Sequence, residues 1–296
     1  MAATGCLFTF YTLTPLHAGS GDSTGVVDLP VQREKHTEYP VVYSSSMKGS
    51  LKWFFHNDPN SEAIFGGEDE RKGSGQMVFT DAKILLFPVR SSEGVFKWAT
   101  CPFVLERLQR DLKFLGISLN TLTVNPKPTD AAGFGWKDIP KLLLEDFVID
   151  VSNESSVMGT LFSQIKILLS SLEPAELEER FVLVSDNVFK TLVTTATQVI
   201  ARNVLDETTK TSKNLWYEEV VPADAVFYTI MKPTYRDDGA TLLNAFVAKV
   251  QDEIFQIGGN ETIGYGFVKM SANLAAEASK IPSATVGKEA SDATAK

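Results

Sequence analysis

The sequence CLFTFYTLTPLHAGSGDSTGVVDLPVQREKHTEYPVVYSSSMKGSLKWFF, which runs from Cys6 to Phe55, decides the fold. Its first part, up to Leu16, alternates and is rich in Phe, Tyr, Thr and Leu, which predicts a strand with one buried face. Its last part places apolar residues at helical spacing after a run of serines, which predicts a helix that begins near Ser46. The chain therefore starts with a strand and a helix separated by a long connection.

That connection, from His17 to about Tyr39, follows neither a strand nor a helix pattern. Loops longer than about 12 to 15 residues without secondary structure are usually functional or disordered. This one contains His17, two aspartates, two basic residues and three glycines. Asp28 stands out because it lies between apolar neighbours, although an aspartate in a loop can equally close an Asx turn or cap a helix. We interpret the loop as a site.

Composition limits the class of protein. The chain has 296 residues and 44% hydrophobic content, enough for one large core or two modest ones. No run of about 18 apolar residues and no basic segment before the first apolar stretch are present, so we expect no membrane span, no signal peptide and a cytoplasmic location. Cys6 and Cys101 lie far apart in apolar surroundings, which predicts buried thiols.

The formal net charge of −9 argues against a protein that coats nucleic acid through bulk charge. Basic residues nevertheless cluster near the N-terminus, where Arg33, Lys35, Lys48 and Lys52 fall within a short stretch. Lys48 and Lys52 lie four residues apart near a helix start, where they could grip a phosphate backbone. They could equally form a solvated face that covers Trp53. Any RNA contact must be local.

The rest of the chain alternates predicted strands and helices, which indicates a mixed α/β or α+β class. We expect a strand from Gln76 to Val89 that ends at Pro88, and helices over Pro102 to Phe114, Ser156 to Leu172 and about Asp237 to Phe255.

A projecting hairpin is predicted between two β-rich arms, about Gln198 to Leu205 and Leu215 to Val221. The connection between them is polar and has no apolar residue to bury. Simple solvent exposure and contact with a partner are equally good interpretations of this tip.

The segment from Gly258 to Gly266 is rich in glycine, and such a turn lets backbone amides approach an anion. It lacks the lysine of a nucleotide-triphosphate loop and follows a helix, so a tight structural turn is the default interpretation. His17, His36 and His56 share no metal-ligand spacing, which makes zinc an unsuitable cofactor.

Seven blocks of the sequence carry a resemblance to a known family. They are Tyr11 to Gly21, Gly25 to Glu34, Ser44 to Lys52, Thr80 to Arg90, Pro102 to Arg107, Leu215 to Glu219 and Gly258 to Gly266. Together they resemble the repeated backbone subunit of type III-B (Cmr) CRISPR interference complexes, which belongs to the RAMP superfamily. The resemblance covers most of the chain in order and leaves residues 112–179 and the C-terminal tail poorly matched.

The resemblance implies an α+β fold with a ferredoxin-like (RRM-like) palm and a long β-hairpin thumb. It implies one palm domain over residues 1–271, with the thumb at about 198–221, a variable insertion at about 112–179 and a disordered tail over 272–296. Copies of such a subunit stack into a helical filament along a CRISPR guide RNA. The other implied partners are complementary target RNA and the remaining Cmr subunits.

The implied activity is that of an endoribonuclease, active within the guide-loaded complex, that cuts bound target RNA at regular intervals. The resemblance places cleavage at Asp28. An ordinary aspartate is ionised at neutral pH and is a poor general base. We therefore interpret Asp28 as a weak ligand or orienter of a divalent ion, Mg²⁺ or Mn²⁺, whose shell RNA phosphates and water complete. Asp22 or Glu34 could assist, so the ligand set stays open.

The predicted RNA contacts follow from the same resemblance and from the basic cluster. They are His17, Arg33, Ser46, Lys48, Lys52, Gly258, Gly259, Gly264 and Gly266, with Lys210, Lys213 and Trp216 on the thumb. Three other functions remain open at this stage. They are a guide-binding subunit with an inert Asp28 loop, a repeat-processing RNase of the same superfamily, and a small-molecule nucleotide enzyme that uses the glycine turn.

Overall fold

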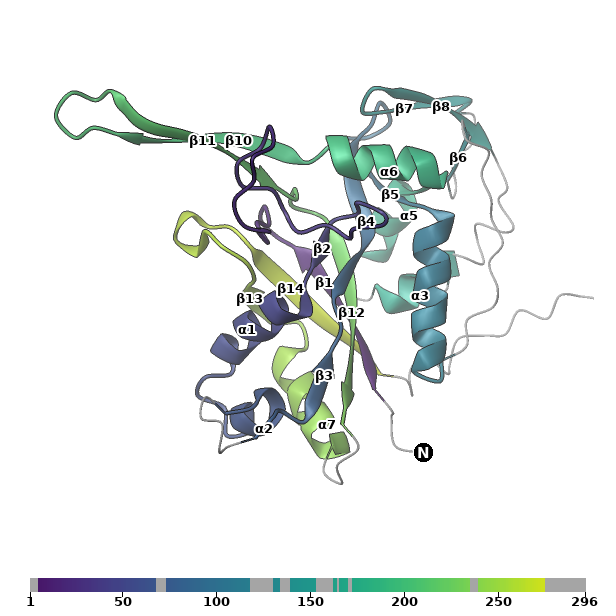
Figure 1. Ribbon diagram of the computed structural model, residues 1–296. Helices are drawn as coiled ribbons and strands as arrows, with labels where there is room; N and C mark the ends of the chain where they lie inside the picture. Colours follow the sequence, from purple (N-terminus) through teal and green to yellow (C-terminus); the bar gives the residue numbers. More distant parts are fainter. Residues whose placement is uncertain are drawn as a thin grey trace, which may run out of the picture.

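The structure is a computed structural model that describes residues 5–67, 73–117, 130–133, 139–152, 162–163, 165–169, 172–234 and 239–274. It shows an α+β architecture in which helices pack around a large mixed sheet, with one long hairpin projecting from the body (Figure 1). The predicted class is therefore confirmed. Within the described ranges, no helix is long and apolar enough to cross a membrane.

The main sheet has twelve strands among the described residues. In spatial order its path is β13 (Ile254–Gln256), β14 (Phe267–Leu274), β1 (Cys6–Thr12), β12 (Val226–Pro233), β4 (Ala82–Arg90), β5 (Phe96–Thr100), β9 (Phe181–Val184), β6 (Asp130–Gly133), β8 (Phe147–Ser152) and β7 (Lys141–Leu144). Off this path, β2 (Val41–Val42) pairs with β4 and β3 (Met77–Phe79) pairs with β12. The pairs β5 with β9 and β6 with β8 are parallel, whereas β1 is antiparallel to both of its neighbours.

Two groups of helices cover the sheet (Figure 1). One group contains α1 (Ser44–Phe54), α2 (Ser61–Phe65) and α7 (Gly239–Val250), in which α7 packs on β12, β14 and β3, and α1 packs on α2 and β13. The other group lies beside β5 and β9 and contains α3 (Pro102–Phe114), α5 (Pro174–Arg180) and α6 (Asp186–Thr195). A short 3₁₀ helix, η2 (Glu261–Ile263), sits between β13 and β14.

Aromatic side chains join the first group of helices to the sheet. The Phe246 ring of α7 stacks on Phe55 at 5.1 Å and meets Phe8 of β1 edge-on at 5.4 Å. All three are fully buried, so truncation of any one to alanine would cost about 3 to 5 kcal/mol. Cys6 and Cys101 are also buried and form no disulfide, as predicted. The core thus anchors the C-terminal end of α1 through Phe55.

Two predicted boundaries are wrong. The strand predicted over 76–89 is divided into β3 and β4, and Pro88 lies inside β4 opposite Trp98 rather than at its end. Proline is tolerated there because the described pairing of β4 with β12 stops at Leu86, which leaves one side of the strand without a ladder partner. The helix predicted over 237–255 ends at Val250, and Ile254 already belongs to β13. Ile254 falls four residues after Val250, so the apolar residue of the strand continues the spacing of the helix and hides the boundary.

The predicted hairpin is present, with arms β10 (Gln198–Leu205) and β11 (Ser212–Val220). It forms a sheet of its own and extends away from the body (Figure 1). The described part of the insertion expected over 112–179 contains β6, β7, β8 and α5, while the helix expected over 156–172 lies partly outside the described residues. The tail beyond Leu274 lies outside them altogether.

Candidate functional site

The loop between β1 and β2 is pinned at several points to segments distant in sequence. The amide of Leu16 donates to the carbonyl of Val221 at 2.8 Å, which ties the start of the loop to the end of the hairpin. Farther on, the amide of Gln32 donates to the carbonyl of Ala18 at 2.7 Å, so the loop closes on itself. The loop predicted to be a site is therefore ordered by backbone pairing although it is neither helix nor strand.

Asp28 is held at the root of the hairpin. The next residue, Leu29, pairs in parallel with Glu218 of β11, through Leu29 N to Tyr217 O at 3.0 Å and Glu219 N to Leu29 O at 3.0 Å. The Asp28 carboxylate accepts a hydrogen bond at Oδ2 from the Tyr217 amide at 2.7 Å. The loop thus makes an isolated β-bridge to the hairpin at Leu29. The side chain of Asp28 is fixed by this distant strand rather than by a local Asx turn.

Glu218 of β11 joins three parts of the site. Its side chain is 4% exposed, and Oε2 accepts from Arg202 Nε at 3.0 Å on the opposite arm of the hairpin. Oε1 accepts from Asn260 of the glycine turn. The same oxygen lies 3.5 Å from Nε2 of His17, and this contact is an ion pair only with a protonated imidazole. One buried carboxylate therefore connects the loop, the hairpin and the turn.

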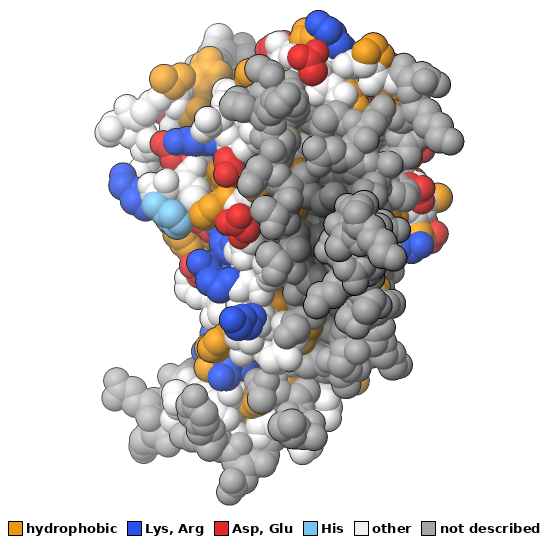
Figure 2. Space-filling view, turned by 90° about the vertical axis from the view of Figure 1, so that its right-hand side faces the viewer, with side chains coloured by type: hydrophobic (Ala, Val, Ile, Leu, Met, Phe, Trp, Pro, Cys, Tyr) orange, Lys and Arg blue, Asp and Glu red, His pale blue; other side chains and the backbone are white. Residues whose placement is uncertain are grey.

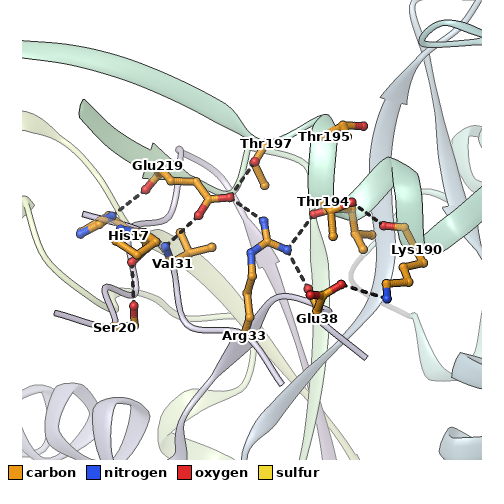
Figure 3. Close-up of polar contacts among 12 residues, drawn as sticks. His17, Ser20, Val31, Arg33, Glu38, Lys190, Thr194, Thr195, Thr197 and Glu219 are labelled. Atoms are coloured by element: carbon orange, nitrogen blue, oxygen red, sulfur yellow. Dashed lines mark hydrogen bonds and ion pairs between the residues drawn. The ribbon is translucent and has the colours of Figure 1, made fainter. Parts of the chain in front are cut away.

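Glu219, on the other face of β11, joins the hairpin to the loop between β1 and β2 (Figure 3). Its carboxylate accepts from Arg33 at 2.5 Å, from the Thr197 hydroxyl at 2.8 Å and from the Val31 amide at 3.0 Å. Its backbone carbonyl accepts from Nδ1 of His17 at 2.7 Å. Because a buried carboxylate is costly unless it is paired and hydrogen-bonded, this set of partners is what permits Glu219 to sit inside the protein.

Arg33 was predicted to contact RNA, and the structure places its guanidinium largely inside the protein. Besides Glu219, it donates to the carbonyls of Glu38 at 2.7 Å and Val193 at 3.0 Å. Figure 3 shows this side chain bridging the loop to the region of α6, where Lys190 also pairs with Glu38 at 2.9 Å. The contacts give Arg33 a structural task, and its contact with RNA stays a prediction.

The glycine turn packs directly on the backbone around His17. The Gly259 amide donates to the His17 carbonyl at 2.9 Å, and a Cβ on Gly258, whose φ is +86°, would lie 2.4 Å from that same oxygen. The Gly266 amide donates to Pro15 O at 2.8 Å. The tight structural turn expected from the sequence is confirmed, and it fixes the position of His17. Anion contact by Gly258, Gly259, Gly264 and Gly266 stays a prediction.

The first turn of α1 is fastened to the loop through Gln32. Its Nε2 donates to the Ser46 hydroxyl and to the Gly19 carbonyl, both at 3.0 Å, and its Oε1 accepts from the Tyr43 amide at 2.7 Å. The serines were expected to cap the helix, but the Ser44 amide instead donates to the carboxylate of Asp81 at 2.7 Å. The N-terminus of α1 therefore lies next to the loop.

The predicted lysines follow on the same helix. Lys48 and Lys52 are half-buried, and the Lys48 ammonium lies 6.0 Å from the centre of the Phe79 ring. The contact of Lys48 fits a cation whose stem covers apolar surface, the alternative considered for both residues. Contact of Lys48 and Lys52 with phosphate stays a prediction.

The hairpin tip is ordered by one aspartate. Asp206 accepts at Oδ1 from the amides of Thr208 and Thr209, each at 2.8 Å, and pairs with Lys213 at 3.0 Å. The Thr209 amide, followed by Lys213, lowers the pKa of Asp206 to about 2. Lys210 is exposed at the tip, whereas Trp216 is half-buried opposite Arg202 near the root.

The described residues contain no group of three or more His, Cys, Asp or Glu side chains that could hold a metal ion. Glu34 was considered as an assistant to Asp28, but its carboxylate accepts from Arg107 at 2.6 Å and from the Thr37 hydroxyl at 2.6 Å. Asp22 is exposed in the same loop. A resident metal centre made by the protein alone does not fit this donor set. An ion shared with RNA phosphates requires only the one carboxylate of Asp28.

Charge elsewhere on the surface is mixed. On the side of the molecule shown in Figure 2, positive and negative side chains are interspersed with hydrophobic ones. The exposed face of α3 likewise carries Glu106, Arg110 and Lys113. This mixture supports the view that any contact with RNA is local.

Sequence reasoning missed Glu218 and Glu219 as the residues that organise the site. Two adjacent glutamates in an arm of a hairpin look like solvated charges. The one available signal was their place between the apolar Leu215 to Tyr217 and Val220, because neighbouring strand residues point to opposite faces and one of the pair must face inward.

A family model described as the RAMP superfamily matches residues 9–269. The chain is 38% identical over 282 residues to the CRISPR system Cmr endoribonuclease Cmr4 of Pyrococcus furiosus, covering 90% of this chain and 94% of that protein. The crystal structure of oligomeric Cmr4 from Pyrococcus furiosus matches with a TM-score of 0.77 at 31% identity and covers 92% of this chain and 100% of that one.

A third match concerns the fold alone. A chain in the cryo-EM structure of the type III-B Cmr-beta bound to cognate target RNA has a TM-score of 0.75 at 20% identity, with 94% of this chain and 99% of that one covered.

Proposed function

This chain belongs to the RAMP superfamily, and on that premise we propose that it is a guide-RNA-binding filament subunit of a type III-B CRISPR effector. In this role it cleaves bound complementary target RNA at regular intervals, as an endoribonuclease active in the assembled, guide-loaded complex. The relative named as a Cmr endoribonuclease, which shares 38% identity, supports this function. The observation that carries it is the attachment of the Asp28 carboxylate to the hairpin root through the Tyr217 amide.

The proposal includes the finer fold and the partners. Strands β14, β1, β12 and β4 lie side by side in that order, and the chain runs β1, α1, β4, β12, α7, β14. This arrangement supports a ferredoxin-like palm over residues 1–271, with the β10–β11 hairpin as its thumb. The partners are guide RNA, target RNA, further copies of the chain and other Cmr subunits. The place of action is the prokaryotic cytoplasm.

Cleavage of RNA by this route requires no nucleophile from the protein. RNA supplies its own nucleophile, the 2′-hydroxyl, so the subunit has to hold the strand in line for attack and stabilise charge at the phosphate. The pairing of Leu29 with Glu218 fixes the backbone beside Asp28, and the Tyr217 amide fixes one oxygen of its carboxylate. Asp28 is then positioned as an anionic group beside the scissile phosphate. A Mg²⁺ or Mn²⁺ ion shared between Asp28 and the RNA would supply Lewis-acid stabilisation of that phosphate.

The substitution Asp28→Asn tests this function sharply because it preserves shape. The asparagine oxygen can still accept from the Tyr217 amide, so the loop should stay in place while the negative charge is lost. In complexes reconstituted with guide RNA, we expect target binding to stay within about twofold and cleavage to fall by at least about 100-fold, the scale for losing one charge-stabilising group. Chelation of divalent ions should likewise abolish cleavage while guide binding persists.

Unchanged cutting by the Asp28→Asn complex would remove Asp28 from the mechanism and favour the alternative of a structural guide-binding subunit whose Asp28 loop is inert, with the cuts made elsewhere in the complex. The matching substitution Asp22→Asn reports whether the exposed aspartate of the same loop assists. A repeat-processing RNase makes a different prediction, since the isolated chain would then cut repeat RNA without any complex.

A further inference from the structure

The C-terminal half of α1 carries an exposed aromatic surface that contributes to neither the Asp28 loop nor the hairpin. Trp53 is 70% exposed, a rare state for the largest side chain. Its indole stacks on the imidazole of His56, with ring centres 5.0 Å apart and planes 18° from parallel. Beside them lies a hollow of about 330 Å³ lined by Gly49, Lys52, Trp53, His56 and Ser61. We call this surface, formed by those five residues, the α1 platform.

The imidazole is fixed in place behind the indole. Nδ1 of His56 donates to the Trp53 carbonyl at 2.7 Å, and Nε2 accepts from the Asn57 side chain at 2.7 Å. The two contacts together require the tautomer with its proton on Nδ1. One face of the indole is therefore backed by a held, flat ring, and the exposure of Trp53 leaves the opposite face open to solvent.

Gly49 provides an independent sign of an external ligand. It lies inside α1, where glycine weakens a helix relative to alanine. A Cβ at this position would meet nothing within 4 Å, so no packing inside the described protein requires a glycine there. Since Gly49 lines the same hollow as Trp53, the absence of a side chain is useful to a molecule that approaches the helix from outside.

The charges around the platform indicate what that molecule is. Lys48 and Lys52 lie four residues apart on one side of α1, and His56 follows just beyond the end of the helix. Aromatic rings flanked by cations along a groove are the pattern that binds single-stranded nucleic acid, because any base can stack and any phosphate can be neutralised. On the side towards α2, Asp58 and Glu62 line an adjoining hollow and set an acidic limit to this basic side.

We propose that Trp53, backed by His56, stacks on a base of the single-stranded guide RNA, with Lys52 near its phosphate and Gly49 leaving room for the sugar. This inference rests on the proposed function and extends it. The RNA path would run along α1, starting from the end where Gln32 holds Ser46 beside the cleavage loop.

The test measures guide-RNA affinity as a function of salt for the purified full chain. Trp53→Ala should weaken binding by about tenfold, the range for one base stacked on an aromatic ring, while the slope of log affinity against log salt stays unchanged. Lys52→Ala should instead reduce that slope by about 0.7, as expected for one lost phosphate contact on a single strand. Trp53→Phe should recover most of the affinity.

Two further variants sharpen the result. Gly49→Ala should raise the midpoint of thermal unfolding, because alanine favours the helix, and should weaken RNA binding, because the methyl group fills the approach. Phe114→Ala is the matched control, since Phe114 is an exposed aromatic ring on α3 with Lys232 4.9 Å from its centre. It should bind guide RNA as the unchanged protein does.

Equal affinity of the Trp53→Ala and unchanged proteins would overturn the inference, and so would a Gly49→Ala variant that binds as well or better. If Trp53→Ala weakened self-association of RNA-free protein and left RNA affinity intact, the platform would be a contact between copies instead. Failure of the unchanged protein to bind guide RNA at all would refute the proposed function itself, which is a distinct outcome.

Discussion

Removal of the Glu219 carboxylate should loosen the whole site, because this one group holds three partners. It accepts from Arg33 at 2.5 Å, from Thr197 at 2.8 Å and from the amide of Val31 at 3.0 Å. In Glu219→Ala the Arg33 guanidinium loses its counter-ion, and the amide of Val31, a residue only 3% exposed, loses its acceptor.

The magnitude follows from these losses. Breaking a buried ion pair typically costs about 3 to 5 kcal/mol. Arg33 is 21% exposed in its side chain and keeps the carbonyls of Glu38 and Val193, so its share is closer to about 2 kcal/mol. A buried amide without a partner adds about 1 to 2 kcal/mol. We expect Glu219→Ala to lower the free energy of unfolding by about 3 to 4 kcal/mol, and Glu219→Gln by less because one acceptor remains.

Urea titration of RNA-free protein measures this change, provided that the variants share one m-value. The control is Glu207→Ala at the exposed hairpin tip, which should stay within about 0.5 kcal/mol of the unchanged protein. A loss below that limit for Glu219→Ala would refute the reasoning, because it would mean that solvent or other groups replace all three hydrogen bonds. In assembled complexes, Glu219→Ala should also reduce cleavage more than target binding, since it displaces the segment next to Asp28.

Two other changes test the glycine turn and a partly buried acid. Gly266→Ala would place a Cβ 1.9 Å from the Ile257 carbonyl and should cost about 2 to 4 kcal/mol by urea titration, whereas Gly264→Ala, with a similar positive φ and open space, should cost about 1 kcal/mol. Burial raises the pKa of Asp224, so the wild-type protein should lose stability relative to Asp224→Asn as the pH rises from about 4 through that raised value. Asparagine tolerates the left-handed backbone at position 224 and can still accept from the Tyr11 hydroxyl. A difference in unfolding free energy between the two proteins that does not change with pH would contradict the raised pKa of Asp224.

Much of the framework could be predicted from the sequence because it depends on local patterns. The alternation before Leu16, the stripe after Ser46 and the two arms around the polar tip each specify an element within a few residues. The boundary errors have a local cause too. Ile254 lies four residues after Val250 and so continues the helical spacing of α7, although it already belongs to β13; periodicity over a short window could not separate the two.

The organisation of the site could not be predicted because its contacts span about 200 positions. His17 meets Glu219 across 202 residues, and Asp28 meets Tyr217 across 189. Composition suggested that the basic residues near the loop would face RNA. The structure adds that Arg33 pairs with Glu219, a partly buried guanidinium against a buried carboxylate, and its contact with RNA stays a prediction. Burial, which a single sequence does not reveal, decides which cations remain available to a ligand.

The root of the hairpin can control the position of the Asp28 loop because side chains alternate along β11. Glu218 and Glu219 point to opposite faces, so one strand grips the glycine turn and His17 on one side and Arg33 on the other. Between them, the backbone of β11 pairs with Leu29 and orients Asp28. A displacement of the root therefore moves the carboxylate with it, while the exposed tip can change without disturbing the core. This arrangement fits the proposed function, in which the tip of the hairpin meets a partner and its root sets the position of Asp28.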